Sequence, residues 1–269
     1  MKSSELPGRL SNILSEMADV AGMLWQRGWA ERNAGNISVN ITNLTDNAIE
    51  DLNDFPLHQL PVTYPALAEK SFLVSTSGSR MRELAREPLK NTVIIHLNES
   101  GNGYRTIVSG QENVTPTSEL PTHLGIHQML TEKGRKEKMV LHAHVTELIA
   151  LTQIKDFCNE KELNRLFWSM HTENGMFLPD GIGFVPYTTP GTHEIAEKTI
   201  KALENHTVAL WEKHGVFAVS ETLNGAFDSI DMLAKAAQIF FLIRNSGYEP
   251  QGFTDKQLAV LKRLGKNFK

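Results

Sequence analysis

The stretch MVLHAH, residues 139–144, places two histidines two positions apart in a short apolar run. Apolar runs of this length between polar segments are typical of buried β-strands. Because side chains alternate across a sheet, His142 and His144 should project from the same face, close enough to hold one metal ion. The stretch therefore predicts a central strand that carries two candidate metal ligands.

The segments on either side of this strand alternate between helical and extended patterns. Helices are predicted at residues 10–29, 81–86, 118–132, 147–152, 160–170, 193–204, 223–245 and 255–264. Strands are predicted at residues 37–41, 72–74, 91–97, 104–108, 139–144, 182–185, 207–211 and 216–220. Residues 42–65 are predicted to be a loop with one helical turn, and residues 171–190 a loop that contains the small strand at 182–185. No repeat or low-complexity linker divides the sequence, so we predict an α/β fold: a single domain over residues 1–269 with a central, mainly antiparallel β-sheet flanked by helices.

The composition argues against nucleic-acid and membrane partners. The 27 Lys and Arg residues against 31 Asp and Glu give a net charge of −4 without a basic block, which disfavours binding to a phosphate backbone. The N-terminal residues lack the apolar segment of a signal peptide, and the longest apolar stretch, residues 236–243, is far shorter than the roughly 20 residues that a bilayer needs. A cytoplasmic location is therefore expected. The glycine patterns of phosphate loops and dinucleotide-binding folds are also absent from the sequence.

Histidine is the residue type available to hold a metal. The single cysteine, Cys158, excludes intramolecular disulfides and cysteine-rich zinc modules, whereas the chain has ten histidines. His214 is a third candidate ligand, in a Lys-His-Gly turn between two predicted strands. Three neutral imidazoles bind Zn²⁺ and leave coordination positions open, as catalytic rather than structural sites do.

Two alternatives to this ligand set remain open at this point. The two strand histidines are equally well explained as half-buried side chains with hydrogen-bond partners. His123 and His127, four residues apart on a predicted helix, also have a spacing that suits a metal. A structural or supporting role is favoured for this second pair, because no neighbouring pattern completes a separate site.

Candidate acid and anion-binding residues lie in three other segments. Thr117 or Ser118 is predicted to cap the helix that follows, with Glu119 in its first turn, where the helix dipole favours a carboxylate. Near a metal, that carboxylate can instead shuttle protons on a bound substrate. The turns at residues 33–36 (NAGN) and 75–79 (STSGS) are small, polar and glycine-containing, and suit an anion. Together with the segment before Glu119 they predict a phosphate-binding cup.

As a set, five segments resemble the class II aldolase/adducin-head family. They are GWAERNAGNIS (residues 28–38), PTSELP (116–121), HAH (142–144), PDGIG (179–183) and LWEKHGVF (210–217). The resemblance spans about residues 10–250. The length of the chain, with the segments at 171–173 and 179–181, favours the rhamnulose-phosphate branch over the shorter fuculose-phosphate aldolases. Two departures stand out: Ala34 occupies a position where glycine is expected, and the loop at 75–79 differs from the usual T-G-S-G run.

The resemblance implies a three-layer fold, an activity and a set of site residues. It implies one Zn²⁺ per subunit on His142, His144 and His214, with Glu119 as the acid/base. It implies a second catalytic residue, Glu173, which reaches a neighbouring subunit's site in a cyclic homotetramer and acts at the aldehyde end of the substrate. The implied phosphate-binding residues are Asn33, Gly35, Asn36, Ser77, Gly78, Thr117 and Ser118.

The implied reaction is the reversible cleavage of a small-molecule sugar phosphate, L-rhamnulose 1-phosphate, in L-rhamnose catabolism. The products are dihydroxyacetone phosphate and L-lactaldehyde, formed through a zinc-bound enediolate. Other reactions of the same superfamily remain alternatives, namely those of L-fuculose-phosphate aldolase, a pentulose-phosphate 4-epimerase such as that acting on L-ribulose 5-phosphate, and a thioribulose-phosphate dehydratase. A non-catalytic binding module like the adducin head is a further alternative, which the presence of all three histidines and Glu119 disfavours.

Overall fold

One nine-stranded sheet runs through the computed structural model, which describes residues 8, 10–45, 52–109 and 114–266. The strands are β1 (Asn36–Asn40), β2 (Leu57–Gln59), β3 (Ser71–Ser75), β4 (Thr92–Leu97), β5 (Gly103–Ser109), β6 (Met139–Ala143), β7 (Gly183–Val185), β8 (Val208–Trp211) and β9 (Gly215–Ser220). Their order across the sheet is β2-β5-β4-β3-β1-β6-β9-β8-β7. Every neighbouring pair is antiparallel except β7 and β8, which are parallel. The predicted fold class, α/β with a central and mainly antiparallel sheet, is confirmed.

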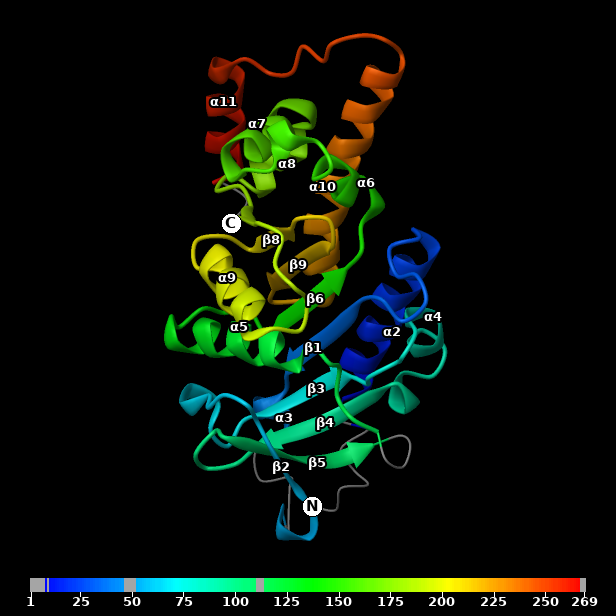
Figure 1. The fold of residues 1–269 in the computed structure, drawn as a ribbon, viewed down its shortest axis with the longest axis vertical. Coiled ribbons are helices and arrows are strands. Elements are labelled where there is room, and N and C mark those ends of the chain that lie inside the picture. Colours follow the sequence, from blue (N-terminus) through cyan, green and yellow to red (C-terminus); the bar gives the residue numbers. More distant parts are fainter. Residues whose placement is uncertain (1–7, 9, 46–51, 110–113, 267–269) are drawn as a thin grey trace.

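Helices cover both faces of this sheet (Figure 1). They are α2 (Ser11–Gln26), α3 (Thr42–Thr45), α4 (Met81–Leu84), α5 (Leu120–Glu132), α6 (Thr146–Leu151), α7 (Glu160–Met170), α8 (Thr172–Phe177), α9 (His193–Leu203), α10 (Leu223–Asn245) and α11 (Asp255–Gly265). One core contains apolar residues of α2, α6 and α10 packed on one face of the sheet, and two smaller cores lie under α5 and α9 on the other. The result is a three-layer arrangement of helices, sheet and helices.

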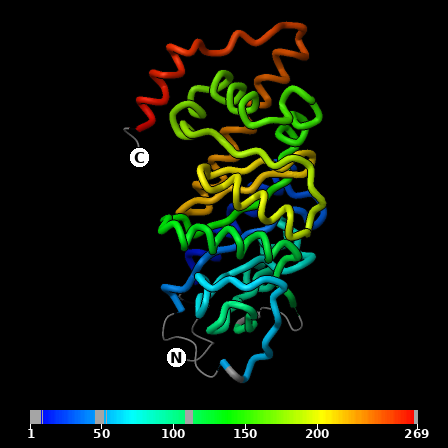
Figure 2. The backbone as a smooth tube through the Cα atoms, turned by 60° about the vertical axis from the view of Figure 1, so that its left-hand side comes forward, coloured from blue at the N-terminus to red at the C-terminus, as the bar shows by residue number. Residues whose placement is uncertain are grey.

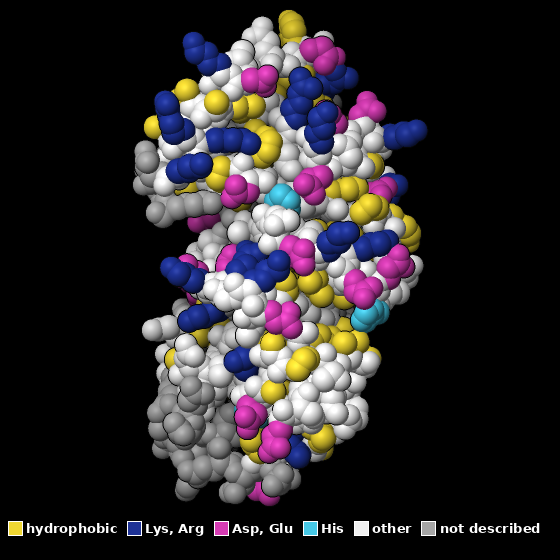
Figure 3. Space-filling model, turned by 90° about the vertical axis from the view of Figure 1, so that its left-hand side faces the viewer, with side chains coloured by type: hydrophobic (Ala, Val, Ile, Leu, Met, Phe, Trp, Pro, Cys, Tyr) yellow, Lys and Arg dark blue, Asp and Glu magenta, His cyan; other side chains and the backbone are white. Residues whose placement is uncertain are grey.

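The C-terminal helices extend the molecule at one end. Figure 2 shows α11 (red) and the end of α10 (orange) far from the strands β2 to β5 (cyan to green). On the face in Figure 3, positive and negative side chains are interspersed, as the nearly balanced charge predicts. Within the described residues, no helix has both the length and the apolar character that a membrane span requires.

Strand β2 and helix α8 form where loops were predicted. In both cases contacts with distant parts of the chain determine the local structure. The three residues of β2 are exposed and pair only with β5, so this edge strand has no apolar alternation to reveal it. Helix α8 is a six-residue turn held from outside: the Asn174 amide donates to the Met232 carbonyl, and Leu261 packs 3.2 Å from the point where a Cβ on Gly175 would lie. The part of the predicted loop at residues 46–51 lies outside the described residues.

Strand register brings the candidate site together. Strand β6 lies between β1 and β9, so that Asn36 is paired with His142 and His142 with Phe217. Helix α5 begins at Leu120 and packs against this part of the sheet (Figure 1). Segments more than 70 residues apart in the sequence therefore meet around the end of β6.

Candidate active site

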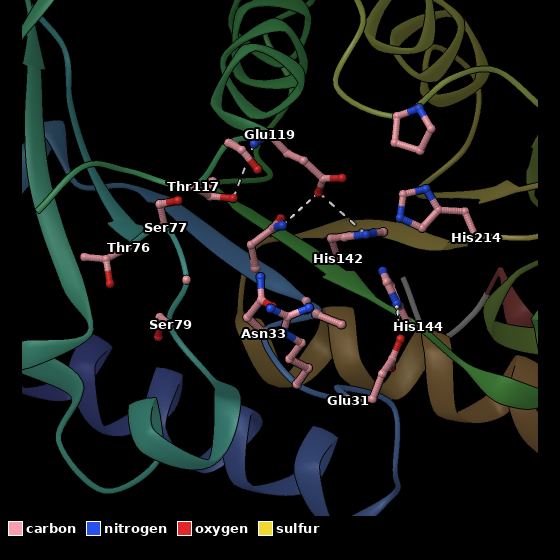
Figure 4. A pocket seen from close by; sticks show the side chains of 17 residues that line it. Glu31, Asn33, Thr76, Ser77, Ser79, Thr117, Glu119, His142, His144 and His214 are labelled. Carbon is pink, nitrogen blue, oxygen red and sulfur yellow. Dashed lines mark hydrogen bonds and ion pairs between the residues drawn. The ribbon is translucent and has the colours of Figure 1, made fainter.

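His142, His144 and His214 lie around one point at the end of β6. One ligand atom from each ring lies within 4.8 Å of the other two. His142 belongs to β6, His144 follows its last residue, and His214 comes from the turn between β8 and β9. Figure 4 shows the three rings facing the same space. The structure thus brings together the three ligands that the sequence proposed.

The turn that carries His214 requires its glycine. A Cβ on Gly215 would lie 2.5 Å from the Ala143 carbonyl oxygen and 3.0 Å from Cε1 of His142. Lys213 adopts a left-handed conformation with φ 60°, and its backbone N–H donates to Thr152 Oγ1 at 2.8 Å. The absence of a side chain at position 215 allows the turn to approach the β6 histidines, and Thr152 holds it there.

Hydrogen bonds orient two of the imidazoles. Nδ1 of His142 donates to the Val216 carbonyl at 3.1 Å, and Nδ1 of His144 donates to the Glu31 carboxylate at 2.8 Å. Each contact leaves the Nε2 lone pair of the ring free. This pattern, with one ring nitrogen anchored to a carbonyl or carboxylate, is typical of metal-binding histidines.

The donor set fits a divalent metal. Among the described residues, Nε2 of His142 and Nδ1 of His214 are buried without a hydrogen-bond partner, an arrangement that costs free energy unless another ligand satisfies them. Burial, followed by the neighbouring imidazoles, holds the pKa of His142 well below 6.5 and lowers that of His214. Both rings are therefore neutral near pH 7, which is the form that binds a metal.

Glu119 lies beside this cluster at the N-terminus of α5. Its Oε2 is 3.6 Å from Nε2 of His142 and accepts a 2.7 Å hydrogen bond from the Asn36 amide. Figure 4 shows both contacts as dashed lines. The prediction that Thr117 or Ser118 caps the helix is wrong, because Glu119 itself is at the N-cap position. The Thr117 hydroxyl instead accepts from the Glu119 N–H at 3.3 Å, in the segment immediately before the helix.

A polar cavity of about 420 Å³ opens above the three histidines and Glu119. All seven proposed phosphate-binding residues line it: Asn33, Gly35, Asn36, Ser77, Gly78, Thr117 and Ser118. Gly35 and Gly78 have positive φ angles of 80° and 76°, which explains glycine at these turns. Ala34, where glycine was expected, also lines the cavity.

Sequence reasoning missed other residues that line the cavity. They are Arg32, which brings a positive charge to the rim, and Glu31, whereas Thr76 and Ser79, which also line the cavity, belong to the predicted anion-binding turn at residues 75–79. Arg32 and Glu31 are part of the quoted segment 28–38, so the signal was present in the neighbouring positions. No pattern in the sequence indicated that Glu31 would pair with a histidine 113 residues away.

Glu173 does not line this cavity. It is on α8, and its Oε2 lies 3.0 Å from Nε2 of His171. Its side chain is 48% exposed. Within one chain the structure therefore does not bring Glu173 to the histidines.

His123 and His127 lie buried behind the site and are not among the three clustered ligands. Both rings contact the Ser38 hydroxyl, at 2.7 and 2.8 Å, and burial lowers the pKa of each to about 3. The three-histidine cluster found among the described residues does not include them. Their geometry agrees with the supporting role favoured from the sequence.

Comparisons with known proteins match this fold and site. The sequence model of the class II aldolase and adducin N-terminal domain matches residues 15–241. The rhamnulose-1-phosphate aldolase of Bacteroides thetaiotaomicron is 42% identical over 253 residues, covering 94% of this chain and 93% of the relative. That of Mannheimia succiniciproducens is 35% identical and covers 90% of both chains.

Solved structures show the same architecture. A sugar-phosphate aldolase from Thermotoga maritima superposes with a TM-score of 0.76 at 30% identity, over 90% of this chain and 98% of that one. An L-fuculose 1-phosphate aldolase shares the fold with a TM-score of 0.62 at 20% identity, over 95% of this chain and 97% of the other.

Proposed function

This chain belongs to the class II aldolase and adducin N-terminal domain family, and from that premise we propose that it is a zinc-dependent aldolase acting on L-rhamnulose 1-phosphate. The reaction is reversible cleavage to dihydroxyacetone phosphate and L-lactaldehyde. One observation carries the proposal: three inward-facing imidazoles, two with unpartnered buried nitrogens, lie beside a carboxylate at the base of a polar cavity. The names of the relatives support the choice of substrate.

His142, His144 and His214 would hold the metal. A divalent ion bound there supplies a Lewis acid that stabilises negative charge developing on the substrate oxygens during carbon–carbon cleavage. Zn²⁺ suits three neutral imidazoles with positions left open for substrate, and one ion per subunit fills this set. The Val216 carbonyl and the Glu31 carboxylate keep two of the rings in ligand orientation.

The far side of the cavity would bind the phosphate. The turns at residues 33–36 and 76–79 present small polar side chains and glycine backbone toward the cavity, and Figure 4 shows Thr76, Ser77 and Ser79 across the cavity from His144 and His214. Thr117 and Ser118 add hydroxyls, and Arg32 adds charge. Anchoring the phosphate there would place the substrate's carbonyl end at the histidines and its scissile bond near Glu119. Binding energy at the phosphate would thus hold the reacting groups in position.

Glu119 would transfer the proton of the chemical step. Its carboxylate is held by Asn36 at 2.7 Å and is only 13% exposed, so it meets the substrate rather than bulk water. In the cleavage direction the C4 hydroxyl of the sugar loses its proton as the C3–C4 bond breaks to release the aldehyde, and Glu119 delivers a proton to the carbon derived from C3, which yields the hydroxymethyl group of dihydroxyacetone phosphate. In synthesis it removes the same proton.

Glu173 would complete the site from a neighbouring subunit. Since it lies outside the cavity of its own chain and is about half exposed, an adjacent copy in a cyclic homotetramer is the route by which it reaches an aldehyde. Mixing Glu119→Gln and Glu173→Gln proteins tests this arrangement. Partial recovery of activity in mixed oligomers is expected, and no recovery would contradict a shared site.

The main experiment compares Glu119→Gln with Glu83→Gln, an exposed glutamate on α4. Glu119→Gln should retain its zinc but exchange the C3 proton of dihydroxyacetone phosphate at least about 100-fold more slowly, as loss of a general base does. Glu83→Gln should match the wild type. Unchanged exchange in Glu119→Gln would remove it from this role.

Two further measurements separate this proposal from its competitors. Chelation should abolish cleavage, and borohydride added with substrate should not trap the enzyme, since no lysine is required; covalent trapping would contradict the metal mechanism. A panel of ketose 1- and 5-phosphates assayed for released aldehyde should favour L-rhamnulose 1-phosphate. Preference for another ketose phosphate would reassign the substrate, and no bound zinc with no turnover would indicate a binding module.

A further inference from the structure

A buried row of polar side chains connects Glu119 to the interior of the protein. The Asn36 amide donates to Glu119, and its carbonyl oxygen contacts Nε2 of His123. Nδ1 of His123 then contacts the Ser38 hydroxyl at 2.7 Å, and Ser38 contacts Nε2 of His127 at 2.8 Å. All four residues behind Glu119 are at most 8% exposed. The row is therefore sealed from solvent except at its Glu119 end.

Matching repeats of helix and strand produce this row. Asn36 and Ser38 are two residues apart on β1, which separates them by about 6.6 Å on one face of the sheet. Glu119, His123 and His127 follow at four-residue intervals along α5, at about 6 Å per step. The two spacings are nearly equal, so side chains from helix and strand alternate in one continuous sequence of contacts.

The donor and acceptor groups of these side chains fix the direction of every hydrogen bond in the row. The Asn36 NH₂ faces the Glu119 carboxylate, because the reverse orientation would oppose two acceptors. The Asn36 oxygen must then accept, so His123 carries its proton on Nε2. Burial keeps His123 neutral, with a pKa of about 3, and its Nδ1 accepts from the Ser38 hydroxyl. The Ser38 oxygen in turn accepts from Nε2 of His127.

We propose that His123, set in its tautomer by Ser38 and His127, is a positioning residue that fixes the Asn36 amide toward Glu119 and thereby holds the catalytic carboxylate beside the metal ligands. This inference rests on the proposed function and extends it to residues that touch neither substrate nor metal. It also gives a reason for two histidines in the core. An apolar pair would fill the same space without the free-energy cost of desolvating two imidazoles.

The test compares His123→Met, which removes the donor at similar volume, with His123→Gln, whose amide nitrogen can replace Nε2. His96→Met is the matched control, because His96 makes the same kind of contact, 2.9 Å to the Ser71 hydroxyl, in the neighbouring strands without joining the row. His123→Met should lower kcat by roughly 100-fold, the effect of a misplaced catalytic group, with little change in KM or zinc content. His123→Gln should recover most of the loss, and His96→Met should remain within about twofold of wild type.

A double-mutant cycle shows whether His123 acts through Asn36. In an Asn36→Ala background, His123→Met should lower kcat by less than about threefold further, since the group that it positions is gone. Equal losses in the two backgrounds, or equal losses for His123→Met and His123→Gln, would overturn the proposal. Before the kinetic measurements, circular dichroism and the amount of bound zinc show whether each variant is folded.

The tautomer of His123 gives a readout that needs no substrate. In wild-type protein labelled with ¹⁵N at histidine, the shifts of His123 should be those of a neutral ring protonated on Nε2. A proton on Nδ1 would contradict the proposal even if every variant lost activity. If the wild type does not cleave L-rhamnulose 1-phosphate, the substrate assignment fails on its own. The role of His123 is then still tested by its tautomer. It is also tested by the kcat of the His123 variants relative to wild type on any ketose phosphate that the protein does cleave.

Discussion

Replacing Gly215 with alanine should damage the metal site and the sheet together. The added Cβ would lie 2.5 Å from the Ala143 carbonyl oxygen, 3.0 Å from Cε1 of His142 and 3.1 Å from Cδ2 of His144. The first of these atoms is backbone and belongs to the β6–β9 ladder, in which Ala143 is paired with Val216. The contact can therefore be relieved only by separating the strands or displacing the histidines.

The size of the effect follows from these distances. Forcing one extra methyl group into a close-packed position costs about 1–3 kcal/mol of folding free energy. Because the same shift moves two ligand rings, zinc affinity should fall by about 10- to 100-fold, as it does when the support of a ligand is lost. Both losses should appear, since the added Cβ meets the backbone of β6 and both histidine rings at once.

Two assays and one control test this prediction. Urea unfolding of the metal-free protein measures the first loss, and competition with a chromophoric chelator measures the second. Gly22→Ala is the control, because Gly22 lies inside α2 and its added Cβ would meet only Ala85, at an ordinary 3.7 Å. That variant should gain about 1 kcal/mol with unchanged zinc affinity. Wild-type stability and zinc affinity in Gly215→Ala would refute the reasoning.

Two other predictions concern protons and ligand support. Burial lowers the pKa of His123 and His127 from 6.5 to about 3, so between these values the unfolded chain binds more protons than the folded one. The free energy of unfolding should fall as pH falls through this window, and His127→Gln should reduce the slope by about 1.4 kcal/mol per pH unit in urea titrations; an unchanged slope would count against neutral burial. Glu31→Gln weakens the contact that orients His144 and should lower zinc affinity by about 10-fold in the chelator assay, whereas wild-type affinity would show that Glu31 does not support the ring.

The strands and longer helices could be predicted because their apolar residues repeat with a clear period. The interval 223–245 coincides with α10, and the interval 160–170 with α7. By contrast, β2 consists of exposed residues and α8 of a single short segment, so neither has a repeat to detect. Their form depends on β5 and on α10 and α11, which are distant in the sequence.

The candidate site likewise has features that a local sequence pattern predicts and features that depend on contacts between distant segments. The ligand histidines carry a local signal, since a two-residue spacing in a strand and a glycine after His214 both have direct structural meaning. The contact between Asn36 and Glu119 joins residues 83 positions apart and depends on where α5 crosses β1. The role of His123 depends on the near-equality of two repeats, in a helix and a strand, which is visible only once the two elements are packed together.

Zinc titration of metal-free protein tests the central claim most directly, namely that His142, His144 and His214 hold one catalytic metal. The rate of L-rhamnulose 1-phosphate cleavage should rise linearly with added zinc and stop rising at one equivalent per chain. In His214→Ala the rate should not rise to a plateau at one equivalent of zinc. Full activity in the metal-free wild type, or an unaltered titration in His214→Ala, would contradict the account.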